Sequence, residues 1–264
     1  MKEQIAKNIN ILGEFCGKRD INELTPEELN RKYGIRQVDV MVLFGGSIMY
    51  GGDIFAQAIK NNIAKKYIIV GGAGHTTETL RQLVYRDYPL IETMGLTEAE
   101  IFNRYITFKY GLKADYLECK STNCGNNITY LLDLLKQNNI EFNSIILSQD
   151  ATMQYRMEAV LRKYVSDNII IINFAVYSAK VIALDSELVY DTEIYGMWDI
   201  DRYLELLMGE IPRLLDNADG YGPKGRDFIA HVDIPQKVIE AFDELKKEHG
   251  SMVREANPLY ASAY

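Results

Sequence analysis

The chain has 264 residues and a formal net charge of −8, and 47% of its residues are apolar. This length suits one large domain or one domain with a sizeable extension, and the apolar content is ample for a packed core. Because the net charge is negative and Lys and Arg are dispersed along the chain, we expect no general binding to nucleic acid.

The start of the chain and its cysteines favour a soluble protein of the cytoplasm. Residues 1–6 lack the charged leader and apolar core of an export signal. No apolar run approaches the roughly 20 residues that cross a bilayer, so we expect no membrane insertion. Cys16, Cys119 and Cys124 are too few for a disulfide framework. The sequence leaves the oligomeric state undetermined.

Strands and helices are predicted to alternate after an N-terminal helical segment, residues 1–37, in which Thr25-Pro26 starts a second helix. We expect strands at 40–44, 67–70, 112–118, 144–148 and 169–174, and helices near 53–62, 76–87, 97–110, 123–138 and 151–165. Strands joined by single helices need right-handed crossovers. Residues 38–180 are therefore predicted to form an α/β domain, a doubly wound, mainly parallel, Rossmann-like three-layer sandwich.

The pattern changes after about residue 180. A long helix is predicted at 198–215, a glycine-rich loop at 216–227 and a last helix at 236–248. These helices are too few for a core of their own. We therefore expect residues 181–264 to form a mostly helical extension packed on the sheet domain.

Three predicted strands end in short polar loops that should meet at one edge of the sheet. Glycines there allow sharp turns and leave backbone N–H groups uncovered where a helix begins. The carboxyl edge of such a sheet is where ligands bind. The expected ligand-binding residues are Gly45, Gly46, Ser47, Gly71, Gly72, Gly74, His75, Gln149 and Asp150. The alternatives are that the glycines only let a helix and a strand pack closely, and that His75 only caps a helix.

A second polar group precedes the predicted helix at 123–138. Ser121, Thr122 and Asn123 offer more hydroxyl and amide groups than one helix cap requires, so we expect them to bind polar atoms of a ligand. Glu118 closes the preceding strand, where an acidic residue can accept hydrogen bonds from ribose hydroxyls. The alternative for Glu118 is an ion pair with a nearby Lys or Arg.

Cys124 lies near a predicted helix N-terminus, where a thiol can become a nucleophile. No residue near it in sequence supplies a base, so we do not expect it to be catalytic. Cys119, Cys124 and His75 are too few and wrongly spaced for a closed zinc site, and we expect no metal.

The loop at 216–227 combines charges with glycines that fix its path. We expect it to form a lid or wall over the crevice, with Arg226 available for an anionic group of the ligand; the alternative is a solvated surface loop. Trp198 and Tyr221 are suited to stack on an adenine or, equally, to pack in the core.

Several longer motifs resemble a known family. These are Glu98-Ala99, Glu118 with Ser121-Thr122-Asn123-Cys124-Gly125 and Asn127, Gln149-Asp150 with Thr152-Met153-Gln154, Glu210-Ile211-Pro212-Arg213-Leu214, and Asp219-Gly220-Tyr221-Gly222-Pro223 with Gly225-Arg226-Asp227 and His231-Val232-Asp233. On these motifs the chain resembles the YdcF-like branch of the SanA/ElyC/YdcF superfamily, a bacterial domain of unknown function. The resemblance implies a Rossmann-like fold, an association with S-adenosylmethionine binding, and site residues that include Glu98 and Asn127.

The chain departs from the superfamily pattern at two positions. Asn126 stands where the superfamily usually has Glu, and Thr152 stands where it tends to have His. These departures argue against transferring a catalytic scheme from the wider group.

Three functions therefore stay open. The first is binding of a small nucleoside-type ligand, with S-adenosylmethionine as the leading candidate. The second is a hydrolase or transferase for a phosphorylated small molecule or a lipid-carrier phosphate, which would need a base such as Glu98, Glu118 or Asp150 and could use a magnesium ion. The third is a ligand sensor without catalysis. The sequence does not decide whether the chain is an enzyme.

Overall fold

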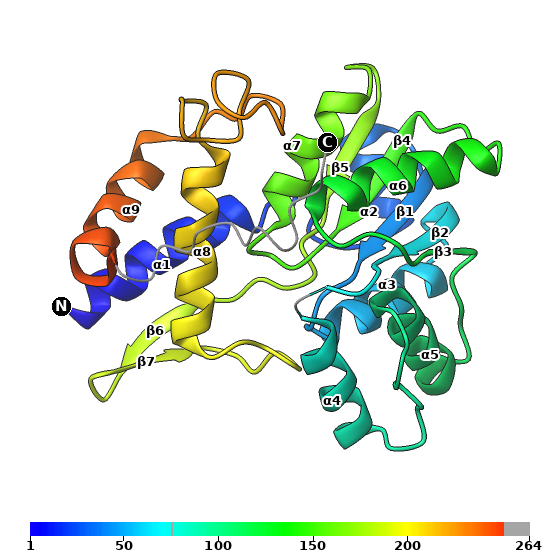
Figure 1. Ribbon diagram of the computed structural model, residues 1–264, viewed down its shortest axis with the longest axis horizontal. Helices are drawn as coiled ribbons and strands as arrows, with labels where there is room; N and C mark the ends of the chain where they lie inside the picture. Colours follow the sequence, from blue (N-terminus) through cyan, green and yellow to red (C-terminus); the bar gives the residue numbers. More distant parts are fainter. Residues whose placement is uncertain (75, 251–264) are drawn as a thin grey trace.

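A five-stranded parallel sheet forms the core of the larger part of the computed structural model, which describes residues 1–74 and 76–250 (Figure 1). Its strands are β1 (Val38–Phe44), β2 (Ala64–Val70), β3 (Tyr116–Glu118), β4 (Ser144–Ser148) and β5 (Ile170–Asn173), in the order β3-β2-β1-β4-β5. All neighbouring strands run parallel. The central strands are buried on both faces, as expected for apolar runs without alternation.

Helices cover both faces of this sheet. They are α3 (Tyr50–Lys60), α5 (Glu98–Tyr110), α6 (Cys124–Gln137) and α7 (Gln154–Tyr164), whereas α4 (Thr77–Asp87) packs on α5. The α3 helix packs on α5, and α6 packs on α7. Because the strand order reverses at β1, right-handed crossovers place these two pairs on opposite faces. The prediction of a doubly wound, mainly parallel, Rossmann-like three-layer fold is confirmed.

Local capping signals set several of these helix ends. Thr97 accepts the backbone N–H of Glu100 while the Glu100 side chain accepts that of Thr97, so a capping box starts α5 where the sequence predicted it. The same helix ends before Gly111, whose φ of +68° lies in the left-handed region. The predicted strand at 112–118 is shorter than expected and spans only β3.

The N-terminal helix packs with the extension. The α1 helix (Lys2–Cys16) contacts α9 (Gln236–His249), α8 (Ile200–Leu214) and strand β6 (Val181–Leu184), and these elements lie together on the left of Figure 1. The short α2 helix (Pro26–Tyr33) connects α1 to β1. Residues 1–16 and 181–249 thus form one layer beside the sheet domain.

The extension contains a hairpin that the sequence prediction missed. Strands β6 and β7 (Glu187–Tyr190) pair antiparallel through a two-residue turn. Asp185 and Ser186 both have positive φ, 47° and 67°, as a type I′ turn requires. Asp-Ser is a weaker turn signal than Asn-Gly, so the expectation of a mostly helical extension overlooked apolar residues on both sides of a two-residue turn.

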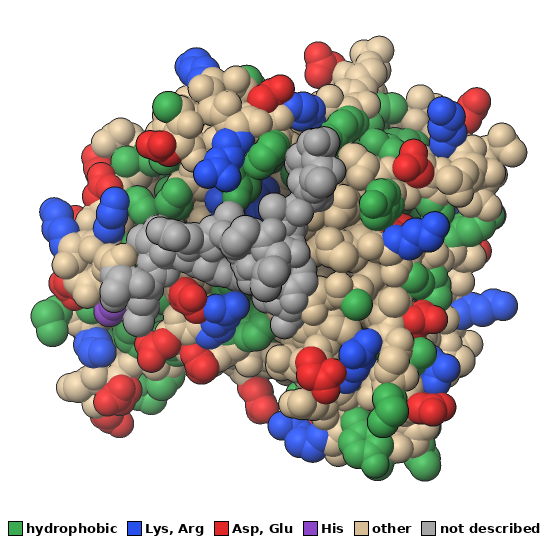
Figure 2. Space-filling view, in the orientation of Figure 1, with side chains coloured by type: hydrophobic (Ala, Val, Ile, Leu, Met, Phe, Trp, Pro, Cys, Tyr) green, Lys and Arg blue, Asp and Glu red, His purple; other side chains and the backbone are tan. Residues whose placement is uncertain are grey.

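Acidic and basic side chains are interspersed over the face of the molecule shown in Figure 2. Within residues 1–74 and 76–250, no helix combines the length and the apolar character needed to cross a membrane.

Candidate functional site

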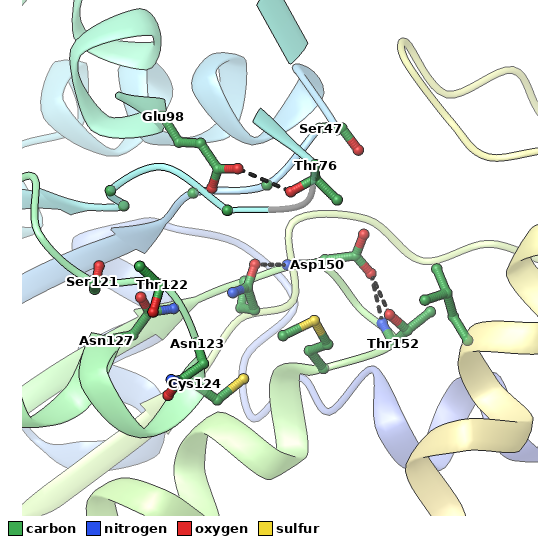
Figure 3. Close-up of a pocket in the computed structure, with 18 of the residues that line it drawn as sticks. Ser47, Thr76, Glu98, Ser121, Thr122, Asn123, Cys124, Asn127, Asp150 and Thr152 are labelled. Atoms are coloured by element: carbon green, nitrogen blue, oxygen red, sulfur yellow. Dashed lines mark hydrogen bonds between the residues drawn. The ribbon is translucent and has the colours of Figure 1, made fainter. Parts of the chain in front are cut away.

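A pocket that opens to solvent lies where β1, β2 and β4 end (Figure 3). The structure brings most of the residues selected from the sequence to its lining: Gly45, Gly46, Ser47, Gly71, Gly72, Gly74, Glu98, Ser121, Thr122, Asn123, Asn127, Gln149 and Asp150. These residues come from loops far apart in the chain, and the parallel sheet gathers them at one edge.

Two of the selected residues do not line the described pocket, and His75 lies outside the described residues. Glu118 is buried, and its carboxylate accepts the backbone N–H groups of Lys120 (2.6 Å) and Ser121 (3.2 Å). Glu118 therefore shapes the turn after β3 instead of facing a ligand, and it forms no ion pair within the described chain. Neither of the two roles considered from the sequence matches this placement.

Arg226 is the second residue outside the pocket, and its position corrects the expectation of a lid. The loop around it folds on itself: a Cβ at Gly220 would overlap the carbonyl oxygen of Leu215. Arg226 is exposed, with its guanidinium 5.8 Å from the centre of the Tyr221 ring. The glycines do fix the path of the loop, but the path leads towards α7, where Lys163 pairs with Asp227 (2.7 Å).

The helical wall of the pocket comes from the first half of α8 instead. Trp198, Arg202 and Leu206 line the pocket, and their spacing of four residues places them on one face of the helix and its leading turn. The Arg202 guanidinium lies 5.8 Å from the Trp198 ring centre and pairs with Glu205. This spacing places Arg202 and Leu206 on the same side as Trp198, but nothing in the sequence places that side at the pocket. The other lining residues outside the predicted site are Thr76, Cys124, Thr152 and Met153.

Glycines at the strand ends have two different roles. A Cβ at Gly45 would come within 2.7 Å of Glu98 Oε2, and one at Gly71 within 3.1 Å of Glu98 Cβ. These glycines let β1 and β2 end against the start of α5, which is the packing alternative. A Cβ at Gly46 or Gly74 would meet nothing closer than 3.7 Å. Gly46 and Gly74 therefore leave open space in the pocket, as a ligand cradle requires.

Glu98 is the first residue of α5 and lines the pocket. Its Oε1 atom accepts hydrogen bonds from the hydroxyls of Thr76 and Thr77, both at 2.9 Å. Burial raises the pKa of the Glu98 carboxyl, and the two threonine hydrogen bonds oppose that shift. A buried carboxyl with a raised pKa beside a pocket is suited to binding or proton transfer.

The N-terminus of α6 opens onto the same pocket. Asn123 caps the helix by accepting the Asn126 N–H at 3.0 Å, and the Asn126 side chain accepts hydrogen bonds from Asn123 Nδ2 (2.8 Å) and Thr122 (3.2 Å). Asn126 thus holds this turn in place. The first N–H groups of a helix lack partners within the helix and favour anions.

Two buried hydroxyls in the lining lack hydrogen-bond partners. Ser47 is 3% exposed and Ser121 is 2% exposed, and neither Oγ atom has a partner among the described residues. An unsatisfied buried polar group costs about 1–3 kcal/mol. A third such hydroxyl, Ser148, belongs to β4 and is absent from the described lining.

Asp150 is a positioning residue because both of its oxygens are occupied. Oδ1 accepts hydrogen bonds from the backbone and side chain of Thr152 (2.9 and 2.8 Å) and from the Tyr177 hydroxyl (2.7 Å). Oδ2 accepts the indole N–H of Trp198 at 3.1 Å. Asp150 thereby fixes the loop after β4 and attaches the segment before α8 to it.

A buried ion pair also holds α8 against the sheet domain. Arg156 of α7 makes two hydrogen bonds to the carboxylate of Glu210 on α8, at 2.5 and 2.8 Å. Because Glu210 is buried and the Arg156 side chain is only 14% exposed, this bidentate pair is a fixed connection, and losing one partner would leave a largely buried charge. Glu210 belongs to the Glu210-Ile211-Pro212-Arg213 motif, so this motif positions the pocket wall.

Cys124 is not suited to act as a nucleophile. Its side chain is buried, and burial raises the pKa of the thiol, which keeps it neutral at pH 7. Among the described residues, no group of three or more His, Cys, Asp or Glu side chains is arranged to hold a metal ion. A comparison of the chain with protein-family models finds no match.

Proposed function

We propose that the pocket binds a small nucleoside-type ligand, with S-adenosylmethionine as the leading candidate. The observation that carries the proposal is the pair of unpartnered, buried hydroxyls of Ser47 and Ser121 in a pocket at the carboxyl edge of the sheet. Buried polar groups nearly always have hydrogen-bond partners, so we expect a polar ligand in the pocket to supply the partners that both hydroxyls lack.

The lining residues suit the different parts of S-adenosylmethionine. The carboxylate of its amino-acid part matches the positive N-terminus of α6 and the side chain of Arg202. The adenine ring matches an apolar wall formed by Trp198, Met153 and Leu206. When bound, S-adenosylmethionine would supply a methyl group for transfer to a second substrate.

A hydrolase or transferase for a phosphorylated substrate is the second candidate. Glu98 favours it, because a pocket carboxyl with a raised pKa is suited to general acid–base catalysis. The N-terminus of α6 would then hold a phosphate group. Binding without catalysis remains the third candidate, since Asp150, the other acidic residue lining the described pocket, is occupied by four hydrogen bonds.

Isothermal titration calorimetry on the full chain distinguishes these functions. We expect S-adenosylmethionine to bind with a dissociation constant below the millimolar range and inorganic phosphate to bind far more weakly. Tight phosphate binding without S-adenosylmethionine binding would support the second candidate. Absence of S-adenosylmethionine binding at millimolar concentration would reject the leading one. Mass spectrometry of gently purified protein would identify any retained ligand.

A further inference from the structure

Glu98 has one oxygen that the protein leaves without a partner. The threonine hydroxyls occupy Oε1, whereas Oε2 has no hydrogen-bond partner within the described chain. Glu98 is only 8% exposed, but it lines the pocket. Its Oε2 atom has no hydrogen-bond partner among the described residues and still keeps some accessible surface. One oxygen of a buried carboxyl is therefore accessible from the pocket.

No cation of the described chain neutralises this carboxyl. Glu98 forms no ion pair there, and Arg81 on α4 is the one charged side chain that acts on it electrostatically. The Arg81 guanidinium is engaged elsewhere: it donates to the carbonyl oxygen of Leu96 (3.1 and 2.7 Å) and pairs with Glu78 (3.3 Å). A buried carboxylate without a cation is unfavourable, so a positive group in the pocket would be attracted to Glu98.

We propose that Glu98 forms a cation subsite that binds a positively charged group of the ligand. This inference rests on the proposed nucleoside-type function and specifies its ligand further. Glu98 and Thr76 lie on one side of the cavity in Figure 3, and Ser121, Thr122 and Asn123 lie on the other. A ligand with a cation towards Glu98 and an anion towards α6 satisfies both sides. The pocket thus selects a zwitterionic nucleoside.

Three nucleosides test the inference with calorimetry. The three differ in their cationic groups. S-adenosylmethionine carries an ammonium and a sulfonium, S-adenosylhomocysteine carries the ammonium as its one cation, and adenosine carries no cation. We expect Glu98→Gln to weaken binding of one or both charged nucleosides about tenfold or more, and that of adenosine less than about twofold. If Glu98→Gln weakens the binding of S-adenosylmethionine alone, Glu98 binds the sulfonium. If it weakens the binding of both charged nucleosides to a similar extent, Glu98 binds the ammonium. Glu27→Gln is the matched control, because it removes an exposed carboxylate that pairs with Arg36 outside the described lining, and it should change none of the three affinities.

A measurement on the wild-type protein makes the test independent of any folding defect in the variant. A cation bound at Glu98 favours its ionised form, so S-adenosylmethionine should release protons on binding at pH values where the raised pKa keeps part of the ligand-free Glu98 protonated and the ligand's amino group stays charged. Titrations in buffers of different ionisation enthalpy measure this release. Equal weakening of all three nucleosides by Glu98→Gln, no weakening, or the absence of proton release would overturn the inference alone. Absence of nucleoside binding by the wild type would overturn the proposed function together with it.

Discussion

The indole N–H of Trp198 donates a 3.1 Å hydrogen bond to Oδ2 of Asp150 and so joins the segment before α8 to the loop after β4. Trp198→Phe removes the donor but keeps an aromatic ring. We expect this change to lower the free energy of unfolding by about 1–3 kcal/mol, because a buried carboxylate oxygen loses its partner. The pocket wall would also be held less firmly, so ligand affinity should fall as well.

Tyr195→Phe provides the control for Trp198→Phe. Tyr195 lies on the same segment and donates to Asp87 (2.8 Å), and neither residue lines the described pocket. Thermal unfolding and calorimetry of both variants separate the two effects. If Tyr195→Phe weakened ligand binding as much as Trp198→Phe, the Trp198–Asp150 contact would have no special role in the site.

Alanine variants of the strand-end glycines are expected to fall into two classes. Gly45→Ala should lower the melting temperature, because its Cβ would come within 2.8 Å of Glu98 Cβ. Gly46→Ala and Gly74→Ala should leave the melting temperature nearly unchanged and weaken ligand binding, because their methyl groups would fill open pocket space. Thermal unfolding and calorimetry test both classes; a large loss of stability in Gly46→Ala with unchanged affinity would contradict the cradle interpretation.

Arg202 and Arg226 are expected to differ in their effect on binding. Arg202 lines the pocket, so Arg202→Gln should weaken binding of a ligand with an anionic group by about 1.5–3 kcal/mol, the range for a hydrogen bond to a charged group. Arg226 is exposed on the loop that packs towards α7, so Arg226→Gln should leave affinity unchanged. Calorimetry on both variants measures the two affinities. A larger loss of affinity in Arg226→Gln than in Arg202→Gln would support the loop as a lid over the pocket.

The sequence was sufficient to predict the sheet domain because its signals are local. Apolar runs, capping residues such as Thr97 and glycine punctuation each act within a few residues, and the parallel order follows from crossover handedness. The gathering of loops from β1, β2 and β4 at one edge follows from the same rule. These features explain why most of the selected residues line one pocket.

The missed features depend on contacts between distant segments. Nothing local to Arg226 shows that its loop folds against Leu215 and towards α7, and nothing local to Arg202 shows that α8 reaches the sheet edge. The role of Glu118 was missed for a different reason. Its carboxylate is occupied by the two N–H groups that follow it, and a strand-end acid looks the same in sequence whether it binds backbone or ribose.

The raised pKa of Glu98 predicts how the stability of the ligand-free protein depends on pH. Burial places the folded pKa above the unfolded value, so the folded state binds more protons between these values and stability decreases as pH rises through the folded pKa. Glu98→Gln removes the titrating carboxyl and therefore this loss of stability at high pH. Its melting temperature should therefore exceed that of the wild type at pH 8, and the difference should shrink towards pH 4.

Glu100→Gln lies on the same helix and should change stability at pH 8 in the opposite direction. The capping-box hydrogen bonds with the Thr97 backbone and side chain lower the pKa of Glu100, so its contribution to stability is present at neutral pH and is lost as pH falls through the lowered pKa. Glu100→Gln should therefore destabilise the protein at pH 8. Thermal unfolding across pH tests both variants; the same sign for both would show that the pKa directions are wrong.

Three serine-to-alanine variants test the central claim most directly. Ser47, Ser121 and Ser148 all carry buried hydroxyls without partners in the described chain, but only Ser47 and Ser121 line the described pocket. Each variant should keep or slightly raise the melting temperature of the ligand-free protein. In calorimetric titrations with S-adenosylmethionine, we expect Ser47→Ala and Ser121→Ala each to cost about 0.5–1.5 kcal/mol of binding free energy, and Ser148→Ala to cost none. Equal affinities for all three variants and the wild type would contradict the claim that these two hydroxyls bind the ligand.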